Sequence, residues 1–168
     1  MTTPETFYYT VQAKSAWEIA LEKGGLYGNQ AFCDADFLAA YEWMVQQMAL
    51  RLPQFGGGYP VWVWPTRPIW RDGSFGKPQA LVLIEAKLTQ DRVLLSDFQS
   101  WHAVLNKFPI LAHQDEKIEM QASWERIFDF EFLENSPDWG EVEIQGVVES
   151  ISLGEIISVE DFSGKQIF

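Results

Sequence analysis

The sequence predicts one α+β domain over residues 1–168, with short helices and an antiparallel or mixed sheet. Two segments near the start have the apolar spacing of helices. They are followed mainly by strand-like segments, with small helices between them. Because strands and helices do not alternate strictly, this order favours α+β over a doubly wound sheet. The 168 residues, 47% hydrophobic and 15% aromatic, are sufficient for one packed core.

The first predicted elements are a strand and a helix that ends at glycine. Residues 7–12 are rich in aromatic and β-branched side chains, which is typical of a strand. Ser15 and Glu18 match a capping box, so they predict the start of a helix that runs to Lys23. Gly24 favours the left-handed conformation that ends a helix.

A second helix is the most strongly periodic segment, and it follows a predicted turn over residues 26–29. Asp34 or Asp36 can cap it, and Pro53 ends it. Trp43 lies off the apolar stripe, so we expect its side chain to be partly exposed or to pack under a loop. The stripe repeats at intervals of three and four residues: Phe37, Ala40, Tyr41, Met44, Met48 and Leu52.

Three of the eight tryptophans gather between residues 59 and 73. Val61 and Val63 alternate there with Trp62 and Trp64, at the period of two that a pleated strand imposes. Pro65 ends the strand, because proline has no N–H to donate.

The loop that follows carries Arg67, Trp70 and Arg71. Guanidinium groups bind phosphate or carboxylate, and indole rings offer a stacking surface, so the segment suits an anionic or aromatic ligand. A core strand followed by an ordinary surface loop is the other interpretation.

The second half of the chain is mainly strands. In residues 141–149 apolar and polar side chains alternate, which predicts Ile144 and Val148 on one face, with Glu143 and Gln145 on the other. Ser96 or Asp97 can cap a helix over residues 98–106, and Ser123 can cap helical turns between residues 117 and 130. The remaining predicted strands cover residues 79–87, 92–96 and 156–159.

The net charge of −12 is concentrated in the second half. Residues 1–84 carry a net charge of −1, and residues 85–168 carry −11. A direct DNA or RNA binder needs the opposite sign, so we expect no nucleic-acid binding. The acidic half forms a solvated surface, or it mimics nucleic acid and binds the basic groove of a protein partner.

Metal and membrane sites are not expected. Cys33 is the single cysteine, and the spacing of His102 and His113 does not suggest a zinc site. The start of the sequence has no apolar run, and no stretch is long enough to cross a bilayer, so a cytoplasmic protein is the simplest expectation.

Several phrases of the sequence, in order, resemble a mainly bacterial family known only as domain of unknown function 3841. They are Ala39-Ala-Tyr-Glu-Trp-Met44, Tyr59-Pro-Val-Trp-Val-Trp64, the run from Val93 to Asn106, Ser123-Trp-Glu-Arg-Ile-Phe-Asp129 and Ile144-Gln-Gly146. The family implies no activity.

A second likeness is to small ADP-ribosyltransferase-like domains. It lies in the opening strand, helix and glycine turn, and in the end of the chain, residues 143–148 and 151–159. The resemblance implies a split sheet that holds NAD in a cleft between its halves. In that superfamily a late strand offers a Glu or Gln toward the nicotinamide ribose, where a carboxylate stabilises the oxocarbenium character of the transition state.

Carried over to this sequence, the resemblance assigns the catalytic role to Glu143, with Gln145 as the other candidate. Tyr9 or Thr10 falls at the first-strand position, where the superfamily usually has His or Arg. NAD binding therefore needs a cation from elsewhere, and Arg67 in the loop is the candidate.

Trp62 or Trp64 would stack on the nicotinamide ring in this interpretation. The sequence thus predicts NAD-dependent ADP-ribosyl transfer, or NAD binding without transfer. The alternatives are a non-catalytic acidic interaction protein, such as a phage- or plasmid-type inhibitor, and a nucleotide-binding module that uses only the tryptophan and arginine loop. The oligomeric state is left open.

Overall fold

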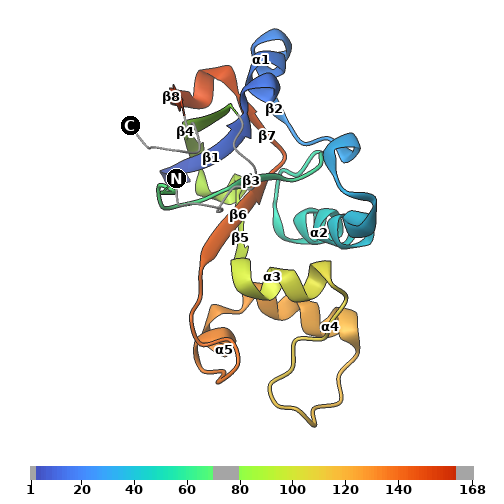
Figure 1. The fold of residues 1–168 in the computed structure, drawn as a ribbon. Helices are drawn as coiled ribbons and strands as arrows, with labels where there is room; N and C mark the ends of the chain where they lie inside the picture. The colour runs from blue at the N-terminus through green and yellow to red at the C-terminus, as the bar shows by residue number, and fades with distance from the viewer. Residues whose placement is uncertain (1–2, 70–79, 162–168) are drawn as a thin grey trace.

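The computed structural model describes residues 3–69 and 80–161, whose strands form three small antiparallel sheets (Figure 1). The first sheet has the order β1-β4-β8: Glu5–Ala13, Leu81–Thr89 and Ile156–Asp161. The second has the order β3-β6-β5: Val61–Val63, Ile144–Val148 and Leu94–Asp97. The third pairs β2 with β7: Gly25–Tyr27 and Ser150–Ser152. The predicted α+β class with antiparallel sheets is confirmed.

One backbone bridge joins the two three-stranded sheets. The N–H of Tyr9 in β1 donates to the carbonyl of Trp64 at 2.8 Å, and the N–H of Trp64 donates back at 2.7 Å. Trp64 directly follows β3, so the edge strand of one sheet meets the edge strand of the other at this point. The result is a split sheet, whose two halves are joined at the bridge.

Helix α1 (Lys14–Lys23) ends as predicted, but it does not start as predicted. Gly24 caps it with φ of 85°, in the left-handed region. The residue before the helix is Ala13, and no side chain caps it, so the capping box was wrong. The turn predicted after it is also wrong, because Leu26 pairs with Ile151 of β7, a partner distant in the sequence.

Helix α2 (Leu38–Arg51) follows a 3-10 turn that Asp34 caps by accepting from the N–H of Asp36. Trp43 is only 5% exposed, so the expectation of a partly exposed side chain was wrong. Its ring lies edge-on to Trp124 and parallel to Phe128, with centroids 5.6 and 6.0 Å away. These partners come from the second half of the chain, which the helical period cannot reveal.

The other helices are α3 (Phe98–Leu105), α4 (Met120–Trp124) and α5 (Phe130–Glu134). Asp97 caps α3, as one of the two predicted candidates. Ser123 does not cap α4: Glu119 does so, and Ser123 lies inside the helix with its hydroxyl on the carbonyl of Met120.

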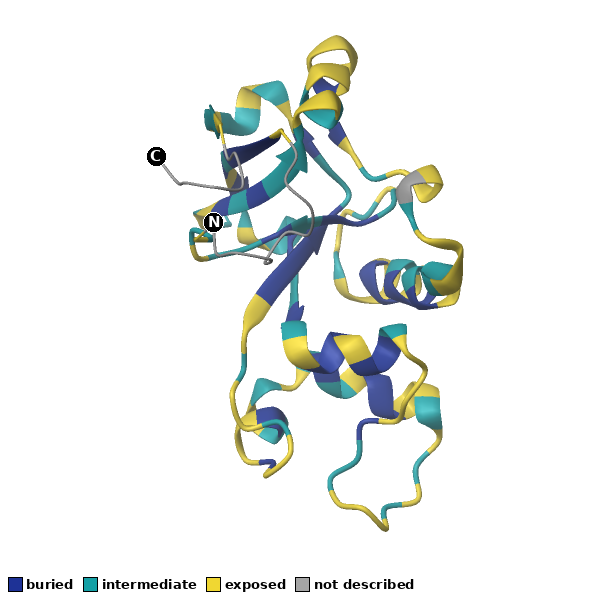
Figure 2. Cartoon of the chain, viewed as in Figure 1, coloured by how far each residue is buried: buried dark blue, intermediate teal, exposed yellow. Residues whose placement is uncertain are grey.

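Strand β6 is covered on both faces. Val147 packs with the cluster formed by α2, α3 and α4, whereas Val148 packs with the cluster between the sheets. Gln145 is therefore buried, at 3% exposure, and the predicted polar face is wrong over this stretch. Figure 2 shows the change from the exposed segment before β6 to the buried strand.

Candidate functional site

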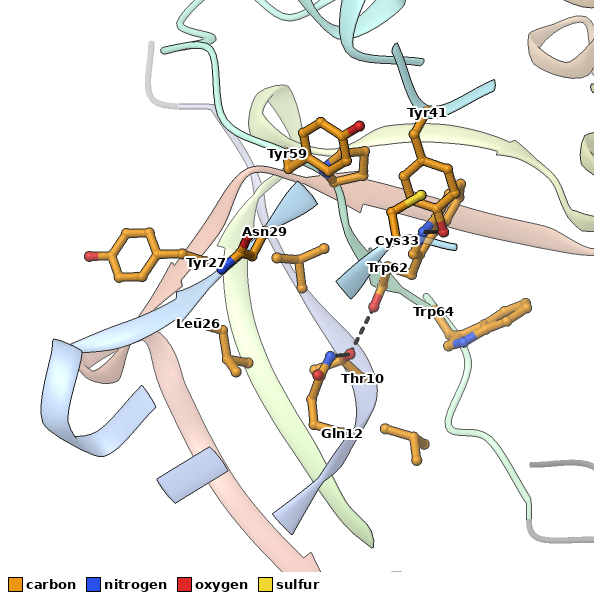
Figure 3. A pocket seen from close by; sticks show the side chains of 14 residues that line it. Thr10, Gln12, Leu26, Tyr27, Asn29, Cys33, Tyr41, Tyr59, Trp62 and Trp64 are labelled. Atoms are coloured by element: carbon orange, nitrogen blue, oxygen red, sulfur yellow. Dashed lines mark hydrogen bonds between the residues drawn. The ribbon is translucent and has the colours of Figure 1, made fainter. Parts of the chain in front are cut away.

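A pocket of about 280 Å³, called the junction pocket below, opens where β1, β2 and β3 come together (Figure 3). Each of these strands belongs to a different sheet, so the pocket exists because the sheets split. Its side chains include Thr10 and Gln12 from β1, Tyr27 from β2, Trp62 from β3 and Tyr41 from α2.

Two side chains of β1 form a hydrogen-bonded chain on one face of the pocket. The hydroxyl of Thr10, 2% exposed, donates to the carbonyl of Trp62 at 2.8 Å. The amide of Gln12 donates to the Thr10 hydroxyl, also at 2.8 Å. This arrangement ties β1 to β3 and holds the Gln12 side chain in one orientation. Thr10 was predicted as a binding residue, and Gln12 was missed.

The opposite wall is aromatic. The indole N–H of Trp62 donates to the Tyr41 hydroxyl at 3.0 Å, and the two rings meet edge to face with centroids 6.1 Å apart. Tyr41 also stacks on Tyr59, with a centroid distance of 5.9 Å and an interplanar angle of 19°. Such pairs hold the rings rigidly, so the wall is prearranged for a planar ligand.

The wall is electrically neutral. Burial raises the pKa of the Tyr41 phenol, although the hydrogen bond from Trp62 opposes the rise. Burial also raises the pKa of the Tyr59 phenol and of the Cys33 thiol, with smaller contributions from nearby acidic groups. All three groups therefore stay protonated at neutral pH. None of the described residues that line the pocket is an acid or a base.

The rim near Tyr59 depends on glycine and on one carboxylate. A Cβ at Gly28 would lie 1.9 Å from the carbonyl oxygen of Tyr59, so only glycine fits this close approach. The Glu149 carboxylate accepts from the N–H groups of Gly56 and Gly58, at 2.8 and 3.2 Å. These contacts anchor the glycine-rich segment that leads into Tyr59.

The structure brings three of the predicted binding residues to the pocket: Thr10, Trp62 and Trp64. Tyr9 is not part of the lining. It packs with the small cluster around Leu83, and a hydrogen bond with Glu85 raises its pKa. Adjacent residues of a strand point to opposite faces, which is why Thr10 and Tyr9 separate.

Arg67 is also outside the described lining. Its guanidinium forms a half-exposed ion pair with Glu160 at 2.6 Å. Trp70 and Arg71, the other members of the predicted loop, lie outside the described residues.

The two predicted catalytic residues lie apart from the junction pocket. The buried amide of Gln145 donates to the Ser96 hydroxyl at 3.2 Å. Glu143 is exposed, and its carboxylate accepts from the amide of Gln99 at 2.8 Å. Its backbone N–H donates to the fully buried Asp97 carboxylate at 2.9 Å. The catalytic roles of Glu143 and Gln145 stay predictions.

Glu143 borders a different, open depression of about 240 Å³, called the acidic hollow below. Asp138, Glu141, Trp139 and Gln99 form the rest of its described lining. Three carboxylates around one space attract cations and repel phosphate. Among the described residues, no group of three or more His, Cys, Asp or Glu side chains is arranged to hold a metal ion. No helix of the described chain combines the length and apolar character needed to cross a membrane.

Comparison with known protein families gives one match, to a domain of unknown function, DUF3841, over residues 7–117. The chain belongs to the DUF3841 family. Searches of the curated proteins and of the solved structures gave no match. The DUF3841 segment contains every described residue that lines the junction pocket, whereas Glu143 and Gln145 lie beyond it.

Sequence reasoning on this DUF3841 chain found the tryptophans of the site but missed Gln12, Asn29, Tyr41 and Tyr59. One signal was present: Thr10 and Gln12 are two residues apart in a strand and therefore share a face. Tyr41 belongs to the apolar helical stripe that predicts burial. The periodicity treats it like the core residues of that stripe, so no local pattern marks it as a pocket residue.

Proposed function

We propose that the junction pocket binds NAD or a related nucleotide, in a domain of ADP-ribosyltransferase-like shape. The observation that carries the proposal is the position of the pocket, at the junction of the separate sheets and beside the first strand. This is where the resemblance of the sequence to ADP-ribosyltransferase-like domains implies that NAD binds. The family match neither adds to this proposal nor opposes it.

The chemistry of the pocket supports an uncharged planar group as the part that enters. Trp62, Trp64 and Tyr41 supply aromatic surface, and Thr10 and Gln12 supply hydrogen-bonding groups. A volume of about 280 Å³ lies just below the ~300–1,000 Å³ typical of ligand pockets. It therefore suits a nicotinamide or base with its ribose, and the phosphates would remain outside the neutral interior.

Transfer would follow only if an acid reaches the ribose. In ADP-ribosyl transfer the bond between nicotinamide and ribose C1′ breaks, nicotinamide leaves, and an acceptor forms a new bond at C1′ and loses a proton. Glu143 is the proposed carboxylate for this step, with Gln145 as the alternative. Because both lie outside the junction pocket, the geometry supports binding more strongly than catalysis.

Titration with NAD, followed by thermal unfolding, tests binding. A ligand at about 100 times its dissociation constant stabilises the folded state by roughly 2.7 kcal/mol, which raises the melting temperature by several degrees. Replacing Thr10→Val should reduce this shift, because the Thr10 hydroxyl orients Gln12. Thr6→Val is the matched control, since Thr6 is on the same strand but away from the pocket. An absent shift in the unmodified protein would contradict the proposal.

Nicotinamide release in the same samples tests transfer. Glu143→Ala should abolish release and leave the NAD-induced shift intact, whereas Glu141→Ala, in the same exposed segment, should retain release. Full release in Glu143→Ala would exclude Glu143 as the catalytic acid. Binding without release in the unmodified protein would leave a nucleotide-binding module.

A second candidate function is a non-catalytic acidic interaction protein. The observation that favours it is the acidic hollow, where Asp138, Glu141 and Glu143 surround Trp139. Binding to a basic protein whose affinity falls steeply as the salt concentration rises would support this function, because salt screens exposed charges. Binding that does not change with salt would contradict nucleic-acid mimicry.

A further inference from the structure

A second depression adjoins the junction pocket. It has a volume of about 210 Å³ and lies between α1 and β2; we call it the helix-side hollow. The two depressions share five lining residues: Gln12, Leu26, Tyr27, Gly28 and Asn29. They therefore adjoin along these shared residues, and we treat them as two compartments of one cleft and call the shared residues, which include Gln12 and Asn29, the ridge.

One face of α1 forms the far wall of the helix-side hollow. Its residues are Ala16, Ile19, Ala20 and Lys23, at the three- and four-residue spacing of a single helical face. Ile19 is 42% exposed and Tyr27 is 57% exposed, so the compartment presents apolar surface to solvent.

The charges around the helix-side hollow suit an anionic linker. Lys23 has no ion pair in the described part of the chain, and it is the only charged residue of the described lining. An ammonium group there can contact a phosphate that lies across the ridge. None of the described residues lining either compartment is acidic, so a diphosphate would meet no carboxylate in the cleft itself.

We infer that the helix-side hollow binds the second nucleoside of a dinucleotide, while the junction pocket binds the first. This inference rests on the proposed function and goes further, because it assigns the ligand two separate subsites. The first heterocycle contacts Trp62 and Tyr41, the amides of Gln12 and Asn29 contact the ribose hydroxyls, and Lys23 contacts the diphosphate. The second heterocycle packs on Ile19 and Ala16 of α1, because Ala20 is buried in the core.

A dinucleotide is favoured over a mononucleotide because its two nucleosides are covalently joined. Neither compartment alone reaches the volume of an ordinary ligand pocket, but the two together do. Joining two weakly bound halves makes the second binding event intramolecular, which raises affinity by roughly a hundredfold or more. A mononucleotide would fill only one compartment and would not gain this increase in affinity.

Calorimetric titration with NAD, nicotinamide mononucleotide and AMP tests the inference. The unmodified protein should bind NAD roughly a hundredfold more tightly than nicotinamide mononucleotide. Ala16→Phe fills the helix-side hollow, so it should reduce the NAD affinity to that of nicotinamide mononucleotide and leave the mononucleotide affinity unchanged. Ala39→Phe, an exposed alanine of α2 away from both compartments, should behave like the unmodified protein.

The outcomes separate the inference from the proposed function. Equal affinity for NAD and nicotinamide mononucleotide, or unchanged NAD binding in Ala16→Phe, would overturn the second subsite and leave the junction pocket. AMP binding that depends on Ala16, without any binding of NAD or nicotinamide mononucleotide, would support the hollow and overturn the proposed pocket. No binding of any of the three would overturn both.

A second pair of variants keeps the test decisive if Ala16→Phe does not fold. Lys23→Met should lower NAD and AMP affinity about tenfold and make their binding less dependent on salt. Lys14→Met, at the other end of the same helix, removes an exposed lysine that lines neither compartment. If Lys23→Met and Lys14→Met bind NAD equally well, the diphosphate contact and the second subsite are both rejected.

Discussion

The junction pocket and the acidic hollow differ in how each uses its polar groups. In the junction pocket, Gln12 donates to the Thr10 hydroxyl, which donates to the carbonyl of Trp62, and the described lining carries no charge. In the acidic hollow, the Glu143 backbone is held by buried Asp97 while carboxylates point into open solvent. The first region is prearranged for a neutral planar group, whereas the second offers only an open acidic surface.

The comparison shows that the acidic residues and the best-formed ligand pocket lie in different regions of this protein. The acidic residues gather in the second half of the sequence, yet several of them have structural roles: Glu119 caps α4, Glu116 pairs with Arg126, and Glu149 anchors a glycine segment. The compartment best shaped for a ligand is instead in the nearly neutral first half. Four substitutions test this separation, in decreasing order of effect.

Gly28→Ala should have the largest effect and should damage only the junction pocket. Its Cβ would lie 1.9 Å from the carbonyl oxygen of Tyr59, so the β2 edge and the Tyr59 segment must move apart. We expect a loss of about 3 kcal/mol in the free energy of unfolding, measured with urea. Gly154→Ala is the control, because nothing lies within 4 Å of its Cβ position. Equal stability of the two variants would show that the close approach is absent in solution.

Asp97→Ala should instead damage the region beside the acidic hollow. The substitution removes the N-cap of α3 and leaves the backbone N–H of Glu143 without its acceptor. The free energy of unfolding should fall by about 2 kcal/mol. Hydrogen exchange should speed up at Ser100 and Glu143 and stay unchanged at Trp64 in the sheet junction. Faster exchange at Trp64 as well would mean that the two regions are coupled.

Glu149→Gln should loosen the rim of the junction pocket, with a smaller loss of stability than the two preceding substitutions. The variant replaces a carboxylate that accepts from Gly56 and Gly58 by an amide with one acceptor oxygen. We expect a loss of about 1 kcal/mol in unfolding free energy. The fluorescence of Trp62, isolated by comparison with Trp62→Phe, should become more accessible to quencher. No change in either measurement would remove Glu149 from the architecture of the rim.

Glu116→Gln should have the smallest effect, confined to acid pH. The hydrogen bond from Arg126 holds the pKa of Glu116 below its ordinary value. A carboxyl with a lowered folded-state pKa contributes stability above its unfolded-state pKa and loses it as pH falls through the folded-state value. The variant should therefore lose less stability than the unmodified protein as pH falls below about 4.5. Glu141→Gln is the control, because it removes an acid that has no such pair among the described residues. An equal loss of stability at acid pH in both variants would contradict the prediction.

The fold class and most elements could be predicted because their signals are local. The local composition and side-chain pattern of residues 7–12, 79–87 and 156–159 predicted strands, and the structure contains β1, β4 and β8 there. The left-handed cap at Gly24 and the cap of α3 at Asp97 were also predictable, because a cap depends only on its own turn.

Apart from the caps predicted at Ser15 and Ser123, the misses share one cause, which is pairing over long sequence distances. The segment Gly25–Tyr27 has the composition of a turn but becomes a strand because Ser150–Ser152 supplies its partner. Trp43 is buried by Trp124 and Phe128, and Gln145 is buried because β6 has helices on one face and a sheet on the other. None of these partners lies within the window that a periodicity can read.

The sequence by itself determined most of the helices and strands and the tryptophans that one pocket now uses, because periodicity and capping act over a few residues. Only the tertiary structure decided which of those residues meet. The bridge between Tyr9 and Trp64 joins the edges of two separate sheets and brings Thr10 and Trp62 into one pocket, and it leaves Arg67 and Glu143 outside the described lining. The physical reason is that backbone pairing sets the register of distant strands, and the register decides which face each side chain shares.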